Sequence, residues 1–173
     1  MKKTDIKRIF LIIYPLLVYY ILYYSFDALL LSALDPLSAI TLAGALTVPF
    51  MWMIYRRLLI PHNTEKPTPD EVKRILLWTA LIISTGVILN IAANLLPNIA
   101  DLGSYEEDAA VFDSGSLIQR ILATVIVIPV LEELTFRVIV LGQLLQWMPK
   151  NAAVIISGLL FGIAHFNILQ FVY

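Results

Sequence analysis

The sequence predicts an all-α protein, a polytopic transmembrane helical bundle of about five spanning helices. The chain has 173 residues, of which 60% are hydrophobic and only 14% are charged, whereas soluble domains carry roughly 45–50% apolar and about 25% charged residues. The mean hydropathy is +0.84. Apolar runs recur at about the 20 residues that a spanning helix needs. We therefore expect residues 1–173 to form a single membrane domain, multi-pass in the cell membrane, with the lipid bilayer as its main partner.

Five apolar runs separated by short connections define the expected helices. The first is not expected to be a signal peptide, because it exceeds the apolar region of about 7–15 residues found in such peptides and lacks a small-residue cleavage site. The expected spans are residues 9–31, 37–55, 75–97, 117–142 and 152–173.

Charge at the ends of these spans predicts their orientation. Basic residues precede the first span, flank the second connection and lie in the fourth, so they share one side. By the positive-inside rule this side, with the N-terminus, is cytoplasmic. The opposite connections are acidic, and Arg120 is the exception. The basic residues are Lys2, Lys3, Lys7, Arg8, Arg56, Arg57, Lys66, Lys73, Arg74 and Lys150.

Several functional classes have no support in the sequence. There is no basic tract of the kind that binds nucleic acid. The absence of cysteine excludes disulfides, a thiolate metal site and a cysteine nucleophile. No H-E-x-x-H zinc motif is present. Ser157 and His165 are eight apart on one expected helix, about 12 Å along its axis, and so cannot form a dyad. The tyrosine-rich side of the first span is expected to pack or to anchor at the interface.

The segment 129–137, PVLEELTFR, places three ionisable groups inside an apolar helix. An ionised side chain at mid-bilayer costs roughly 2.5–3.5 kcal/mol even on the lenient insertion scale. Glu133 and Arg137 are four apart and can pair. Glu132 points about 100° around the helix and has no partner there, so it must find one on another helix, take up a proton or hold water. Pro129 is expected to kink the helix just before these groups.

His165 on the fifth span is the expected partner of Glu132. It is the only ionisable side chain of that span before Tyr173. Gly158 and Gly162 form a GxxxG pair, which favours close helix approach. His165 and Glu132 could together hold and deprotonate a water molecule. The alternative from the residues alone is a buried Glu–Arg–Glu network that only locks helices together.

Two motifs carry a family resemblance. The run 132–137 is an EExxxR motif and the run 161–165 is an FxxxH motif. In this order on consecutive membrane helices, they resemble the CAAX protease and bacteriocin-processing (CPBP, or Abi) family of intramembrane endopeptidases, which includes the CAAX prenyl endopeptidases. The resemblance covers residues 117–173, about a third of the chain.

The resemblance implies a role for each motif residue. Glu132 and His165 would activate the attacking water. Glu133 would be oriented by Arg137 or would assist in this activation, and Phe161 would shape the pocket wall. It also implies a peptide or lipidated protein substrate. No cofactor is expected. Zinc is possible but disfavoured, because the ligands of zinc sites are usually clustered more closely in the sequence than these two carboxylates and one histidine.

One family feature is missing before Tyr173. Family members carry a further HxxxN or HxxxD motif on a later helix, thought to build the oxyanion hole. The expectation is that the C-terminal part of the family domain is absent from this chain, or that its activity is impaired. Three functions remain open: an intramembrane endopeptidase, a non-catalytic family member in bacteriocin immunity or membrane scaffolding, and a proton-coupled transporter subunit.

Overall fold

The computed structural model describes a chain whose assigned elements are all helical, which confirms the all-α class. It describes residues 3–59, 68–70, 72–74, 76–77, 81, 84, 88, 110–111 and 114–164. Most of the expected span 75–97, and the fifth span from His165 onward, therefore lie outside the described residues. The elements are α1 (Lys3–Leu30), α2 (Pro36–Leu58), α5 (Leu117–Ile121), the π-helix η1 (Leu122–Val127), α6 (Ile128–Glu132), the π-helix η2 (Glu133–Val140), α7 (Leu141–Leu144) and α8 (Lys150–Ala164).

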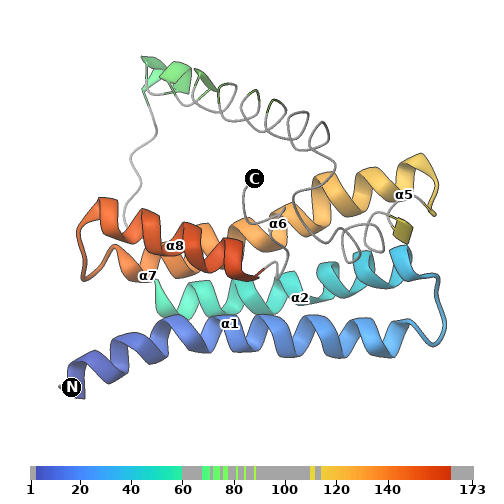
Figure 1. Ribbon diagram of the computed structural model, residues 1–173, viewed down its shortest axis with the longest axis horizontal. Helices are drawn as coiled ribbons and strands as arrows, with labels where there is room; N and C mark the ends of the chain where they lie inside the picture. Colours follow the sequence, from blue (N-terminus) through green and yellow to red (C-terminus); the bar gives the residue numbers. More distant parts are fainter. Residues whose placement is uncertain are drawn as a thin grey trace, which may run out of the picture.

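The helices pack side by side along one axis (Figure 1). α1 and α2 form an antiparallel pair, and α2 also packs on η1, α6 and η2. Elements α5 to α7 follow one another without a break over residues 117–144, which is the expected fourth span. α8 turns back and packs on η2 and α7, while α1 contacts η2 from another side. The segment η2 is therefore the common neighbour of α1, α2 and α8.

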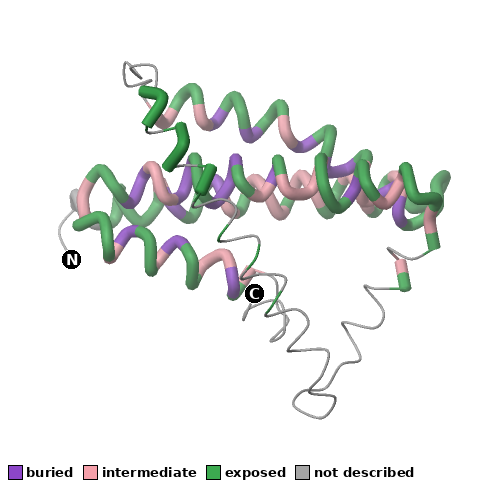
Figure 2. The backbone as a smooth tube through the Cα atoms, turned by 90° about the horizontal axis from the view of Figure 1, so that it is seen from above, coloured by how far each residue is buried: buried purple, intermediate pink, exposed green. Residues whose placement is uncertain are grey.

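Two of the described helices are long and apolar enough to cross a membrane. These are residues Ile6–Leu30 and Pro36–Leu58, close to the expected spans 9–31 and 37–55. Only 6% of the apolar window of α1 is buried within the structure, and its outer side exposes large apolar residues such as Phe10, Leu17 and Ile21. Figure 2 shows exposed residues repeating along the outer sides of the helices. A core helix of a soluble protein buries such residues, so this surface suits contact with lipid.

Small residues bring α2 close to the fourth span. Ala39, Ala43 and Thr47 are fully buried along one side of α2. A Cβ added at Gly44 would lie 2.9 Å from Cγ1 of Val127, so only glycine fits without movement of the neighbour. Membrane helices approach closely through such small residues, because lipid provides no hydrophobic force between them.

The expected close contact at the GxxxG pair is only partly found. Gly162 is buried, but Gly158 is exposed, and no described atom lies within 4 Å of a Cβ built there. Among the described residues, Gly158 therefore makes no close helix contact. The buried residues of α8 are Ala153, Ser157 and Gly162.

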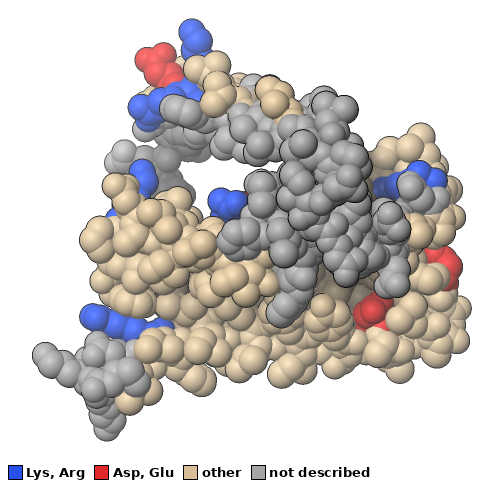
Figure 3. Space-filling view, in the orientation of Figure 1, with Lys and Arg blue, Asp and Glu red and all other residues tan. Residues whose placement is uncertain are grey.

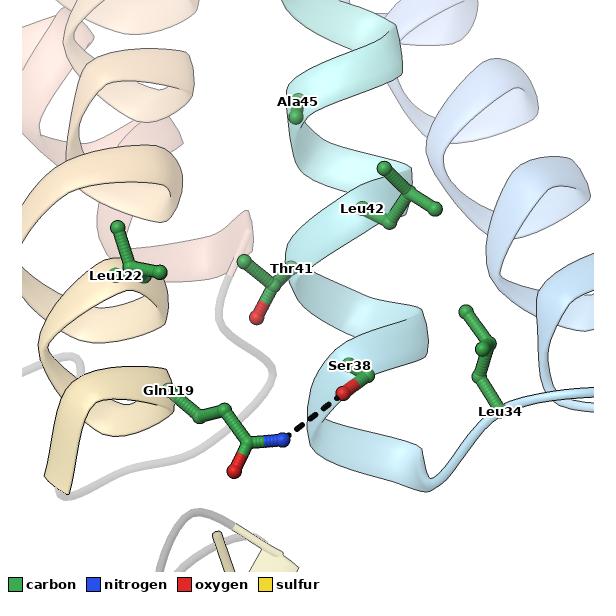
Figure 4. A pocket seen from close by; sticks show the side chains of 7 residues that line it. All are labelled: Leu34, Ser38, Thr41, Leu42, Ala45, Gln119 and Leu122. Carbon is green, nitrogen blue, oxygen red and sulfur yellow. Dashed lines mark hydrogen bonds between the residues drawn. The ribbon is translucent and has the colours of Figure 1, made fainter. Parts of the chain in front are cut away.

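A polar network joins the beginnings of α2 and α5. Asp35 caps α2 and accepts a hydrogen bond from the Ser38 backbone N–H at 3.0 Å. Hydrogen bonding by the Ser38 side chain, and then by its backbone, holds the Asp35 pKa below its ordinary value. Ser116 and Gln119 form the capping box of α5. The Gln119 amide donates to the Ser38 hydroxyl at 3.1 Å (Figure 4). A cavity of about 260 Å³ lies beside this bond, with Leu34, Leu42, Ala45 and Leu122 in its wall, and none of the described residues that line it is ionisable.

Pro129 is accommodated by π-helical turns on both sides of α6. The backbone N–H of Ile128 bonds to the carbonyl of Ala123, and that of Leu141 bonds to the carbonyl of Phe136. Both bonds span five residues, which widens the turn relative to an α-helix. Proline disturbs the regular ladder because it lacks an N–H and crowds the preceding turn. The helix therefore continues through Pro129, and its disturbance appears as a change in hydrogen-bond pattern.

Several basic side chains gather at the end of the bundle where α1 begins. Figure 3 shows Lys and Arg at the end where α1 begins, the end that holds Lys7, Arg8 and the C-terminal turn of α2 with Arg56 and Arg57. The Arg8 guanidinium carbon lies 5.7 Å from the centre of the Trp147 ring. Near the other end, the exceptional Arg120 donates from Nε to the Gly115 carbonyl at 2.9 Å. A cytoplasmic N-terminus remains the prediction that this polarity favours.

Candidate active site

The two glutamates of the EExxxR motif face different surroundings. The expected pair of Glu133 and Arg137 forms, with 3.8 Å between Oε1 and Nε. Their side chains are nevertheless 65% and 48% exposed, so they lie on the outer side of η2. The expected alternative, a buried network of both glutamates with Arg137, is therefore not found among the described residues. The pair can orient its members, but such exposed pairs contribute little to stability.

Arg137 joins the EExxxR motif to the FxxxH motif. Its guanidinium carbon lies 5.6 Å from the centre of the Phe161 ring on α8. The same ring meets Phe136 edge to face, with 5.2 Å between ring centres and planes inclined by 75°. Both distances fall in the range of favourable cation–π and aromatic contacts. The two motifs thus meet directly, although 24 residues separate Arg137 from Phe161 in the sequence.

Ser157 fixes α8 against the π-helical turn of η2. Its hydroxyl donates to the Phe136 carbonyl at 3.0 Å, and the bond is buried. The same carbonyl accepts the Leu141 N–H across the wide turn. Ser157 therefore has a clear structural partner, and sequence reasoning, which considered only its distance from His165, did not find it. The signal that could have found it is a polar side chain four residues before Phe161 on an apolar helix.

Glu132 lies on the inner side of the same helix, towards α1. It is half-buried and lines a cavity of about 260 Å³ together with Tyr19, Tyr23, Tyr24 and Asp27. It also interacts electrostatically with Tyr19 and Tyr20. The two carboxylates thus point in different directions, as the helical spacing predicts. Glu132 is the one that faces a partly open cavity.

The tyrosine-rich side of α1 both packs and lines this cavity. Tyr19 stacks on Tyr23 with 6.0 Å between ring centres and meets Phe136 edge to face at 6.1 Å. Packing was the expected role. Participation in a cavity wall beside Glu132 was not expected, because no sequence pattern shows which helix α1 will face.

The last described turn of α8 is tied to α1 next to Glu132. The Tyr20 hydroxyl donates to the Ala164 carbonyl at 3.0 Å. Ala164 directly precedes His165, which lies outside the described residues. The contact between Glu132 and His165 therefore stays a prediction. Among the described residues no group of three His, Cys, Asp or Glu side chains could hold a metal ion.

Comparison with known proteins identifies one segment of the chain. Residues 114–173 match the family model described as type II CAAX prenyl endopeptidase Rce1-like. No curated protein and no solved structure matches the chain. The matched range contains both motifs, which confirms the resemblance predicted from them. Residues 114–173 are therefore similar to the Rce1-like CAAX prenyl endopeptidases, a family of membrane-embedded proteases.

Proposed function

We propose that the chain is an intramembrane endopeptidase that hydrolyses a peptide bond close to the membrane, using a water molecule activated by Glu132 and His165. The observation that carries this proposal is the contact of the Arg137 guanidinium with the Phe161 ring. It joins the two motifs whose order resembles the protease family. The family match over residues 114–173 supports the same class of chemistry.

The register of α8 supports a His165 that faces Glu132. Ser157 bonds to the Phe136 carbonyl, and Phe161 packs on Phe136, so both lie on the side of α8 that meets η2. Residues four apart share a helix face, and His165 is four residues beyond Phe161. The proposal requires His165, which directly follows Ala164, to share this face; the Tyr20 hydroxyl donates to the Ala164 carbonyl.

The proposed chemistry follows from the different environments of the two glutamates. Glu132 is half-buried and lines a cavity, so we assign it as the general base that takes a proton from the attacking water. The water oxygen then bonds to the substrate carbonyl carbon. Collapse of the tetrahedral intermediate breaks the C–N bond as a proton passes to the leaving amine nitrogen. His165 orients the water and assists these transfers.

The remaining motif residues support that step. Glu133 is exposed and paired with Arg137, which suits a positioning role better than that of the base. Phe161 forms part of the wall between the motifs. The substrate is a peptide or a lipidated protein that reaches the site from the bilayer. The chain is multi-pass in the cell membrane, with its N-terminus in the cytoplasm.

Purified full-length protein in liposomes tests the proposal. Cleavage of fluorescent peptides, with and without a prenyl group, is measured for the wild type, Glu132→Gln, His165→Ala and the double variant. Loss of a general base costs about 10²–10⁴-fold in rate, and groups that act as a unit lose little more when both are removed. We therefore expect large and similar losses in all three variants, while Asp35→Asn, a matched acidic change at the cap of α2, retains full activity. Chelators are expected to leave the wild-type rate unchanged.

Two results would replace the proposal with an alternative. Biological activity that survives both Glu132→Gln and His165→Ala would indicate a non-catalytic membrane role in immunity or scaffolding. Proton flux across the liposome membrane that is lost in Glu132→Gln, without any peptide cleavage by the wild type, would indicate a proton-coupled transporter.

A further inference from the structure

We propose that the cavity beside Glu132 is a binding subsite for a basic side chain, Lys or Arg, of the peptide substrate, and that Asp27 determines this specificity. The proposal rests on the proposed function, because it names the substrate class for the same site. It concerns a set of residues on α1 that lies outside both motifs and outside the matched segment 114–173.

The first observation is an unsatisfied oxygen. Oδ1 of Asp27 is buried and has no hydrogen-bond partner, although the side chain as a whole is only half-buried. A buried polar atom without a partner costs free energy, and carboxylate oxygens lose more than neutral groups do. Native proteins leave few such atoms unpaired, and one that is unpaired calls for a water, an ion or a ligand as its partner.

The second observation is the aromatic wall next to this oxygen. Tyr19, Tyr23 and Tyr24 line the same cavity. The rings of Tyr23 and Tyr24 meet edge to face, with 5.4 Å between their centres, so aromatic rings of more than one orientation lie beside the cavity. Aromatic faces attract cations through the ring quadrupole. Tyrosine rings combined with a carboxylate therefore suit a cationic group better than an anionic or purely apolar one.

The charge of the residues that line the cavity also favours a cationic ligand. Two carboxylates, Asp27 and Glu132, line the cavity, and no Lys, Arg or His is among the described residues that do so. The apolar part comes from residues such as Ile40, Ile128 and Leu131. A long side chain with an aliphatic stem and a charged end matches both parts, because Lys and Arg bury their stems along apolar surface.

The size of the cavity suits a single side chain. Its volume of about 260 Å³ is smaller than the roughly 300–1,000 Å³ of sites for whole small molecules. Because Glu132 lines the same cavity, a side chain bound there would place an adjoining peptide bond next to the proposed base. The subsite would thus select the residue beside the bond that is cut.

Direct binding tests this inference without any need for catalysis. The probe is Nα-acetyl-lysine N-methylamide, which keeps the charged ε-ammonium group. The matching norleucine compound has the same aliphatic stem and no charge. Binding to the full-length protein in lipid nanodiscs is measured by saturation-transfer NMR for the wild type, Asp27→Asn and Asp35→Asn. Asp27→Asn keeps the shape of the side chain and removes its charge, while Asp35 lies outside the cavity and has its own partner in Ser38.

We expect the wild type and Asp35→Asn to bind the lysine probe at least about tenfold more tightly than the norleucine probe. Asp27→Asn should lose this preference and retain its weak binding of norleucine. Equal binding of both probes by the wild type, or an unchanged preference in Asp27→Asn, would overturn the inference. Circular dichroism and gel filtration of each variant check that the helices and the monodisperse state are retained.

A kinetic arm separates failure of the subsite from failure of the proposed function. Peptide pairs that differ only by Lys or norleucine at each position around the cleaved bond are compared by kcat/KM. Cleavage without preference for Lys at any position would leave the protease proposal intact and reject the subsite. Absence of cleavage together with selective binding of the lysine probe would reject the protease proposal and leave a cation-binding cavity.

Discussion

The Arg137 guanidinium lies over the Phe161 ring, with 5.6 Å between the guanidinium carbon and the ring centre. This contact joins two helices at the point where both sequence motifs lie. Because Arg137 lies on the exposed side of η2, it can organise the outer wall of the site, while Glu132 lines the cavity towards α1.

A double-mutant cycle tests whether this contact contributes to the free energy of unfolding. The variants Arg137→Gln, Phe161→Leu and their combination are compared by reversible unfolding in detergent micelles. A partly exposed cation–π contact is worth about 0.5–1 kcal/mol, so the double variant should be less destabilised than the sum of the singles by that amount. Strict additivity would show that the two side chains do not interact.

Ser157→Ala should loosen α8 from the fourth span. The variant removes the buried bond from the Ser157 hydroxyl to the Phe136 carbonyl. Hydrogen bonds between membrane helices contribute about 0.6 kcal/mol on average and up to about 1.7 kcal/mol, so a loss in that range is expected in the free energy of unfolding. Ser25→Ala, at an exposed serine of α1, is the matched control. Equal effects of the two substitutions would contradict the assigned role of Ser157.

Two glycine substitutions should change the stability of the protein in opposite directions. A Cβ at Gly44 meets the stiff, β-branched side chain of Val127 at 2.9 Å, so Gly44→Ala is expected to destabilise by overpacking, which typically costs about 1–3 kcal/mol. Gly158 faces open space, so Gly158→Ala should stabilise the helix by about 0.5–1 kcal/mol. Thermal unfolding of both variants measures the contrast. A destabilised Gly158→Ala variant would instead indicate a close contact there.

The cap of α2 predicts a pH dependence of stability. The hydrogen bonds from Ser38 lower the Asp35 pKa below its ordinary value of 3.8. A lowered pKa in the folded state adds stability above the ordinary value, and this stability is lost as the pH falls through the folded-state pKa. The wild type should therefore unfold at a higher temperature than Asp35→Asn at neutral pH, and the difference should vanish well below pH 3.8. A difference that persists in acid would show that charge is not its cause.

The sequence predicts much of this fold because two of its signals lie within single helices. Apolar length identifies the helices Ile6–Leu30 and Pro36–Leu58 within a few residues. The spacing of Glu133 and Arg137 predicts their pairing. Each of these features depends on residues of one helix alone, which is why the sequence can identify them.

Features that depend on how helices face each other were predicted less well. The exposure of the Glu133–Arg137 pair and of Gly158 follows from the rotation of η2 and α8 about their axes. Wide π-helical turns on both sides of Pro129 change that rotation, and a pattern based on 3.6 residues per turn does not include them. The cavity between α1 and Glu132 depends on the same rotations, so the sequence did not identify Asp27 or Tyr20 as residues near the site.

The central claim, that Glu132 rather than Glu133 faces His165, can be measured by crosslinking. The chain contains no cysteine, so the pairs Glu132→Cys/His165→Cys and Glu133→Cys/His165→Cys can be introduced without further changes and treated with a short thiol-reactive crosslinker in native membranes. We predict rapid crosslinking of the first pair and slow or no crosslinking of the second. Faster reaction of the Glu133 pair, or no reaction of the Glu132 pair while both thiols remain accessible to a small alkylating reagent, would contradict the account.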